Sequence, residues 1–247
     1  MVMHTSFGVA LAAAALTVGC AFAAAPIAVA APEYPTDTTS CSGTELDDCY
    51  RSDQMHEFAE IGERMVTGYL TQIGITGDAL PTLTFIPSGR TTGSQCVDMN
   101  GHETQHDRSY DYCPTDNTVY IGQTGLWESY RQYGAAGPIS GLAHEYGHFL
   151  QSVTQVPNPG NAAETIRHEN QADCFSGTFI GYLYDRGWIE SPEVVDSVEQ
   201  YLTATASAEA PGRDHGTARE RIESFTLGYT AGLPACSQFS PETPLTR

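Results

Sequence analysis

The stretch His144-Glu145-Tyr146-Gly147-His148 decides how the rest of the sequence is interpreted. It has the pattern His-Glu-x-x-His and lies in a segment that can form a helix. Residues four positions apart share one helix face, so His144 and His148 can hold one Zn²⁺ at about 2.0–2.1 Å each. Glu145 can then polarise a metal-bound water, which suits hydrolysis of an amide bond. Random placement of the His and Glu residues would give roughly 0.02 such matches, so chance is a weak explanation.

Composition and charge exclude several other classes of protein. The chain has 247 residues, of which 40% are hydrophobic and 17% charged, and this is ordinary globular composition. The formal net charge is −19, and all 11 basic residues are Arg. Because so acidic a surface repels phosphate groups, we expect no nucleic-acid partner and no docking on anionic lipid.

The N-terminus has the pattern of an export signal. Residues 1–30 are mostly apolar and end in a candidate cleavage site, Ala28-Val29-Ala30. Residues 31–43 are rich in Pro, Thr and Ser and are predicted to be a flexible segment, which leaves residues 44–247 as one domain. We therefore expect a secreted protein with no membrane contact after cleavage. An uncleaved anchor and lipid attachment at Cys20 are the alternatives.

The cysteines agree with export. Outside the predicted signal there are six, an even number, which in an exported protein indicates three disulfides. Pairing in sequence order is one of 15 possible connectivities. It gives Cys41–Cys49, Cys96–Cys113 and Cys174–Cys236.

Periodicity predicts an α+β fold that is mostly helical with a small sheet. Strands are expected over residues 83–87 and 117–122, separated by a polar loop over 89–111. The second strand comes before the His-Glu-x-x-His helix, and we expect a half-buried edge strand that could pair with an extended peptide. Helices are predicted over about 52–73, 139–153, 162–184, 192–206 and 217–230.

A catalytic zinc usually has three protein ligands, so a third must lie outside the motif. One large class places a third His six residues after the second, but Thr154 stands there. The better candidate is Glu169, which shares a helical face with Asp173. One carboxylate can bind zinc while the other accepts the N–H of a zinc-bound imidazole. A solvated helix face is the alternative, and His168 is the competing ligand, although neighbouring helical positions point about 100° apart.

On these motifs the chain resembles the bacterial neutral zinc metallopeptidases, a zincin-like group. Tyr146 and Phe149 depart from the family pattern, and neither is expected to be a ligand. The resemblance implies a single zincin-like domain, with His144, His148 and Glu169 as zinc ligands, Glu145 as base and Asp173 as the residue that orients an imidazole. Four segments carry it: residues 112–121, residues 143–148 with Gln151, residues 169–174 with Gly177, and residues 215–218 with Arg221, Phe225, Gly228 and Cys236.

His215 is a candidate for stabilising the oxyanion of the reaction. It follows Asp214 in a Gly-containing loop, and a neighbouring carboxylate could keep the imidazole cationic. An ordinary exposed loop residue and a cap for the following helix are the alternatives.

The sequence therefore predicts a secreted zinc peptidase that acts on protein or peptide substrates, with one catalytic Zn²⁺ and Glu145 as general base. Three other interpretations stay open. They are a binding protein on an inactive zincin fold, a zinc amidase acting on cell-wall peptides, and a structural zinc site with a fourth ligand such as His168.

Overall fold

The structure is a computed structural model, and it describes residues 46, 49–97, 103–189 and 194–245. Its contacts divide the chain into two units, Met1–Pro35 and Thr36–Arg247, and the second is the one described below. The predicted export signal and the segment 31–43 lie outside the described residues. Among the described residues, no helix combines the length and the apolar character needed to cross a membrane.

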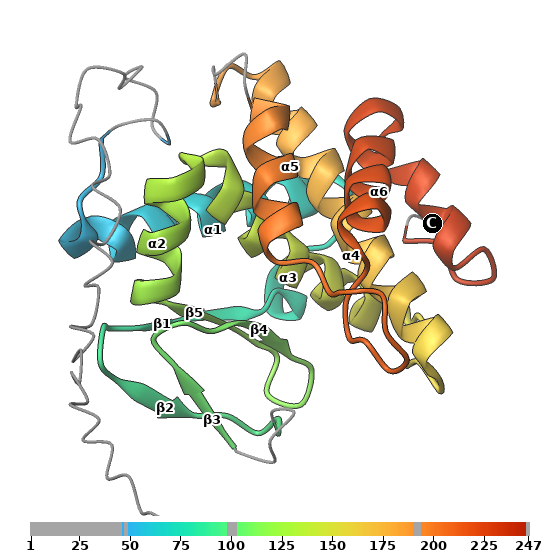
Figure 1. The fold of residues 1–247 in the computed structure, drawn as a ribbon, viewed down its shortest axis with the longest axis horizontal. Helices are drawn as coiled ribbons and strands as arrows, with labels where there is room; N and C mark the ends of the chain where they lie inside the picture. Colours follow the sequence, from blue (N-terminus) through green and yellow to red (C-terminus); the bar gives the residue numbers. More distant parts are fainter. Residues whose placement is uncertain (1–45, 47–48, 98–102, 190–193, 246–247) are drawn as a thin grey trace, which may run out of the picture. The chain divides into compact units, whose positions relative to one another are not determined.

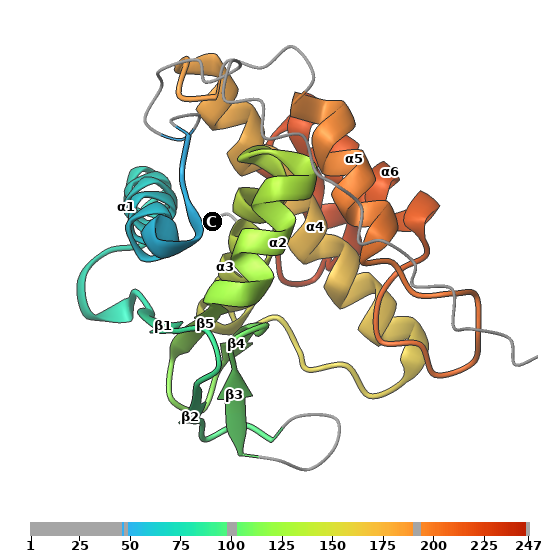
Figure 2. The same cartoon turned by 60° about the vertical axis from the view of Figure 1, so that its left-hand side comes forward.

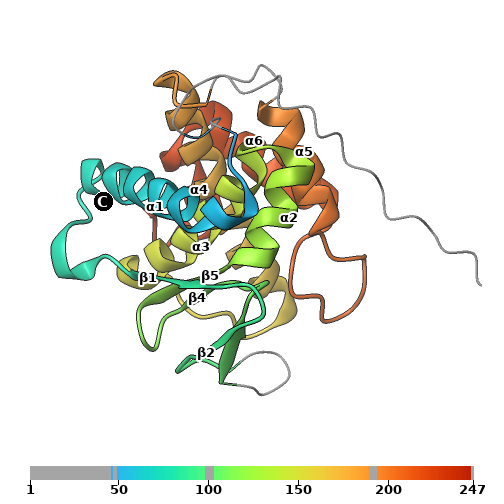
Figure 3. The ribbon, with the colours of Figure 1, turned by 90° about the vertical axis from the view of Figure 1, so that its left-hand side faces the viewer.

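A three-stranded sheet lies against the helices, in the order β1-β5-β4. Its strands are β1 (Thr82–Ile86), β4 (Tyr110–Cys113) and β5 (Thr118–Gly122). β5 pairs with β1 in parallel and with β4 in antiparallel orientation. In Figures 1 to 3 the strands lie below the helices, and α3 (Ala136–Thr154) contacts both β4 and β5.

The prediction that the strand before the motif helix is an edge strand is wrong. β5 is the central strand, and all five of its residues are buried. A strand that is covered on both faces and both edges has no free backbone for a peptide. The edge of this sheet that lies against α3 is formed by β4.

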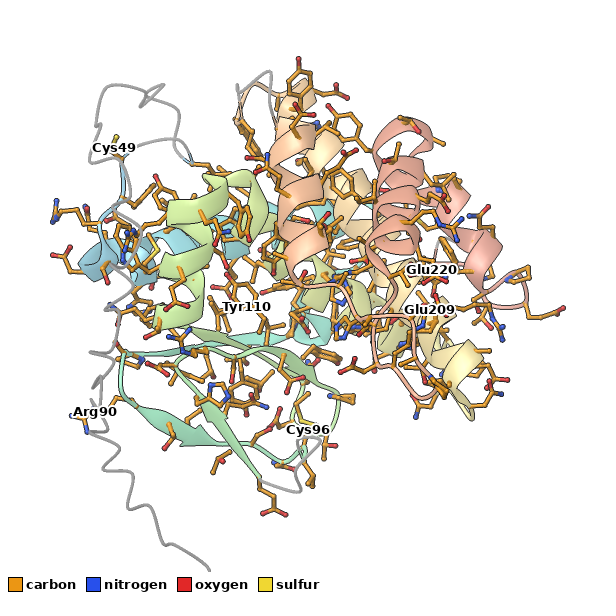
Figure 4. The ribbon with its side chains drawn as sticks, viewed as in Figure 1. Cys49, Arg90, Cys96, Tyr110, Glu209 and Glu220 are labelled. Carbon is orange, nitrogen blue, oxygen red and sulfur yellow. A yellow bond between two sulfur atoms is a disulfide. The ribbon has the colours of Figure 1, made fainter. Side chains whose placement is uncertain are left out.

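The prediction of a loop over 89–111 is also wrong in part. A two-stranded sheet is formed by β2 (Thr91–Gly93) and β3 (Thr104–His106), and β4 begins at Tyr110. β2 and β3 are three residues each and mostly polar, so they lack the alternation that marks a strand. Figure 4 shows Cys96 and Arg90 on the side of the sheet away from the helices, whereas Tyr110 lies between sheet and helices.

The helices follow the prediction, with one addition. All five predicted helices are present, and α2 was not predicted because it follows β5 directly and buries only Leu126. The α+β class is therefore confirmed. The helical elements are η2 (Ser52–Gln54), α1 (Met55–Gln72), η3 (Gly77–Ala79), α2 (Gln123–Tyr133), α3, α4 (Ala162–Asp185), α5 (Val194–Ala204), α6 (Ala218–Ala231) and η4 (Leu233–Phe239).

Glycines let α4 approach its neighbours closely. A Cβ at Gly147 on α3 would lie 2.8 Å from Cα of Ala172 on α4. A Cβ at Gly177 would clash with the backbone of α6, and a Cβ at Gly228 would clash with the backbone of α4. The backbones of α3, α4 and α6 are therefore packed without side chains between them at these points, which fixes the position of one helix against the next.

Within the described part of the chain, two of the three predicted disulfides are seen, Cys96–Cys113 and Cys174–Cys236. The first joins β4 to the segment after β2. The second joins α4 to η4, immediately after Asp173. Cys41 lies outside the described residues, so its pairing with Cys49 stays a prediction.

Candidate metal centre

Three side chains from α3 and α4 meet at one point. Nε2 of His144 lies 3.1 Å from Nε2 of His148 and 3.2 Å from Oε2 of Glu169. Nε2 of His148 lies 3.5 Å from Oε1 of Glu169. Ligand atoms about 2.0–2.1 Å from a tetrahedral ion are about 3.3 Å apart, so the nearest atoms of the three groups, with one oxygen of Glu169 toward each imidazole, suit a shared metal ion. Two imidazoles and one carboxylate are also a donor set that zinc accepts.

The hydrogen-bond partner at Nδ1 of each imidazole determines which ring nitrogen can bind a metal. Nδ1 of His144 lies 2.8 Å from Oδ1 of Asp173, and Nδ1 of His148 lies 2.8 Å from Oε1 of Gln151. Both partners are acceptors, so each Nδ1 carries a proton, and in the neutral ring each Nε2 keeps its lone pair. Both lone pairs are therefore available to a metal at the meeting point.

Asp173 is fully buried and is held by Arg221 of α6. The guanidinium donates from Nε to Oδ2 at 2.9 Å and from Nη2 to Oδ1 at 2.8 Å. Burial opposes ionisation of Asp173, but Arg221 and then His144 outweigh it and hold the pKa of Asp173 far below its usual range. Sequence reasoning gave Arg221 no role of its own, because it is 48 residues away from Asp173 in the chain.

Neighbouring charges shift the pKa values of His144 and Glu169 in opposite directions. Burial disfavours the protonated form of His144, but Asp173 and Glu169 outweigh it and raise its pKa to about 10. Burial raises the pKa of Glu169, but His148 and His144 outweigh it and lower that pKa well below its ordinary value. A metal that binds at the Nε2 atoms would displace any proton there.

Glu145 is buried beside the two imidazoles and is held by the edge strand. Its Oε2 accepts the backbone N–H of Tyr112 at 2.9 Å. Burial raises the pKa of Glu145, and His144 and His148 oppose this rise. Such a pKa shift suits a group that must accept a proton and later return it.

His215 also reaches the centre, from the loop before α6. Its Nε2 lies 3.3 Å from Oε2 of Glu169, and its ring stacks on His144 with centroids 6.0 Å apart. Its side chain is 38% exposed. Partial burial lowers the pKa of His215 despite Glu169 and Asp214, so the expectation of a cationic imidazole is not met. The neutral ring still has an N–H to donate.

His168 lies closer to the centre than expected. Ligand atoms of His168, His148 and Glu169 all lie within 4.8 Å of one another, as do those of His144, Glu169 and His215. The His168 ring stacks on His148 with centroids 5.3 Å apart. His168 therefore stays close to the site, although it is one helical position away from Glu169. We prefer His144, His148 and Glu169 as the ligand set because all three pairs of nearest ligand atoms lie 3.1–3.5 Å apart, whereas His215 comes as close to Glu169 but its ring centroid is 6.0 Å from that of His144.

A cleft of about 560 Å³ opens beside His148 and Glu169. Its walls come from β4, the end of α3, the segment 156–159 and the start of α4. The edge strand reaches its wall through Asp111 and Tyr112, and the Tyr112 backbone N–H is the group that binds Glu145.

Comparison with known proteins gives relatives whose function is not established. The chain is 30% identical over 152 residues to Uncharacterized protein YpfJ of Escherichia coli K12, covering 52% of this chain and 53% of that protein. It is 29% identical over 161 residues to Uncharacterized protein Rv2575 of Mycobacterium tuberculosis H37Rv, covering 52% and 54%. The chain thus spans about half the length of the curated relatives it matches. No family model and no solved structure matches it.

Proposed function

We propose that this chain is a secreted, zinc-dependent peptidase with a zincin-like arrangement of its helices. The observation that carries the proposal is the meeting of His144, His148 and Glu169 at separations that suit one tetrahedral ion, with Glu145 beside them. The resemblance to the bacterial neutral zinc metallopeptidases supports the same ligand set.

Zinc bound by these three residues would act as a Lewis acid that makes water a nucleophile near neutral pH and polarises the scissile carbonyl. Tyr112 holds one oxygen of Glu145 through its backbone N–H, and the second oxygen takes a proton from the attacking water. Glu145 then gives this proton to the departing amine as the C–N bond breaks. Asp173 and Gln151 keep both imidazoles in one tautomer throughout.

His215 is the residue proposed to stabilise the oxyanion. It lies on the open side of the centre, 38% exposed, where its N–H can turn from Glu169 to a substrate oxygen. If His215→Ala leaves kcat/KM within about threefold of the parent, this role is wrong.

The strand expected to pair with a peptide is β4 rather than β5. Among the described residues β4 has a strand neighbour on one side only, and its Tyr112 N–H points to Glu145. An extended peptide laid along this edge would pass through the cleft and bring its backbone to Glu145.

The proposal is tested by zinc analysis of the full chain together with hydrolysis of casein, a peptide library and cell-wall stem peptides. We expect one zinc per chain and cleavage that Glu145→Gln abolishes while the zinc is retained. The matched control is Glu223→Gln, because Glu223 is exposed on α6. A Glu145→Gln variant that binds zinc and cleaves as fast as the parent contradicts the proposal, as does a parent that binds zinc and cleaves none of these substrates.

A further inference from the structure

The cleft beside the metal centre has one carboxylate that the proposed reaction does not use. Two of the lining residues are acidic, Glu169 and Asp111, and Glu169 belongs to the proposed ligand set. The described residues that line the cleft include no Arg or Lys. Among the described lining residues, the ionisable groups that share this cleft with Asp111 are His148, His168 and Glu169, so no permanently cationic side chain lies opposite its carboxylate.

Asp111 is held in place at the wall of this cleft. Its backbone belongs to the edge strand β4, between Tyr110 and Tyr112. Its Oδ2 accepts a hydrogen bond from Nε2 of Gln105, a side chain of β3 that is only 6% exposed. Because a buried amide fixes one carboxylate oxygen, the group is positioned rather than free to turn into solvent.

Asp111 also lies beside the proposed reacting groups. It lines the same cleft as His148, and the next residue, Tyr112, donates its backbone N–H to Glu145. Burial raises the pKa of Asp111, and Gln105 and His148 oppose this rise. No ion pair among the described residues includes Asp111, although the chain forms such pairs at Asp53, Asp173 and Asp214. A part-buried carboxylate that is held by a neutral amide, with no ion pair among the described residues, becomes more favourable when a ligand supplies a positive charge.

We propose that Asp111 selects the substrate by binding a cationic group, a guanidinium or an ammonium, of the peptide that lies in this cleft. This inference rests on the proposed peptidase function. The cation has two possible sources, an Arg or Lys side chain and the α-amine of the peptide. The net charge of −19 favours the same class of substrate, because an acidic protein attracts basic peptides.

The test is peptide binding to the zinc-loaded Glu145→Gln variant, measured by calorimetry so that it does not depend on turnover. One Arg is moved through each position of an acetylated and amidated Ala/Ser host peptide, and each Arg peptide is compared with its citrulline counterpart, which is neutral and nearly isosteric. A second pair without Arg compares a free with an acetylated N-terminus.

We expect one Arg position, or the free amine, to bind about tenfold more tightly than its neutral counterpart, the effect of one charge-assisted hydrogen bond. Asp111→Asn in the same background is expected to reduce this preference to about twofold while binding of the neutral peptide is unchanged. The matched control is Asp196→Asn, an exposed change of α5 outside the cleft, which should keep the preference.

Equal binding of charged and neutral peptides, or a preference that survives Asp111→Asn, overturns the proposal. Equal weakening of both peptides by Asp111→Asn also overturns it, because that result indicates a structural role. If selective binding is found but the parent cleaves no peptide, the proposed function fails while this inference stands. If the parent cleaves peptides but binds them without any preference for a cation, the inference fails while the proposed function stands.

Discussion

The site has a helical wall, formed by α3 and α4, and a strand wall, formed by β4. The polar groups of the helical wall are mostly buried, whereas the outer edge of the strand wall borders the cleft. The helical wall places His144 and Asp173 at 4% and 0% exposure and ties Asp173 to Arg221. The strand wall contributes a backbone N–H and the part-buried side chain of Asp111. The difference fits the proposal that the helical wall binds the metal ion and stabilises the fold, while the strand wall selects the substrate.

The largest effect is expected where the buried ion pair of the helical wall is broken. Arg221→Met leaves Asp173 buried without its cation, so the free energy of unfolding should fall by about 3–5 kcal/mol. The measurement is urea denaturation of the oxidised protein. Arg219→Met is the matched control, because its side chain on the same helix is 79% exposed and its loss should cost less than about 0.5 kcal/mol. Similar losses in both variants would contradict the account.

On the strand wall we expect the loss of one backbone N–H to lower turnover but not zinc content, when two variants that lose the same buried ring of Tyr112 are compared. Tyr112→Pro removes the N–H that holds Glu145, and Pro is tolerated on edge strands. Relative to Tyr112→Ala, which keeps this N–H, kcat should fall about 10- to 100-fold, because a hydrogen bond to a charged group is lost. Equal kcat values in the two variants, with equal zinc content, would show that the Tyr112 N–H does not position the base.

One added carbon atom should disturb the close contact between α3 and α4. A Cβ at Gly147 would lie 2.8 Å from the Ala172 backbone, so Gly147→Ala should reduce the free energy of unfolding by about 1–3 kcal/mol and weaken zinc binding. Gly68→Ala on α1 is the control, because nothing lies within 4 Å of its added Cβ. That change should stabilise the protein by about 0.4–1 kcal/mol. Calorimetric unfolding separates the two, and a Gly147→Ala variant as stable as the parent would mean that the helices are not in close contact.

The smallest effect is expected at the loop that carries His215. Glu220 receives hydrogen bonds from Arg213 and caps α6 with Thr217, and the Arg213 bond lowers its pKa to about 2. Its contribution to stability should be present above the unfolded pKa of about 4.3 and be lost as the pH falls toward 2. Glu220→Gln should therefore cost about 1 kcal/mol at pH 7 and almost nothing at pH 2. Unfolding measured across this range checks the sign, and a difference that grows toward low pH would contradict it.

The sequence predicts the helical wall well because its information is local. Residues four positions apart lie on one face of a helix, whatever the rest of the chain does. This applies to His144 with His148 and to Glu169 with Asp173. The cap of α4 is equally local, since the Asn161 side chain accepts the N–H of Glu164. These features led to the site residues before any tertiary contact was known.

The strand wall could not be predicted in the same way because strand order depends on distant pairing. The apolar run of β5 fits an edge or a centre, and only β1 and β4 on its two sides decide between them. The sequence around Asp111 does not distinguish it from carboxylates in loops. Its place in the site is determined only when β4 pairs with β5. Arg221 was assigned no role for the same reason, since its partner Asp173 lies on another helix.

Zinc affinity of two carboxylate variants, one from each wall, tests the central claim most directly. Competitive titration with a chelator would give the Kd for zinc of the parent, Glu169→Gln and Asp111→Asn. We predict that Glu169→Gln weakens binding by at least about 100-fold, because loss of a ligand should exceed the loss of an outer hydrogen bond, while Asp111→Asn stays within about threefold of the parent. Zinc binding that survives Glu169→Gln unchanged, or that Asp111→Asn weakens as much, would contradict the division of the site into a metal-binding helical wall and a substrate-binding strand wall.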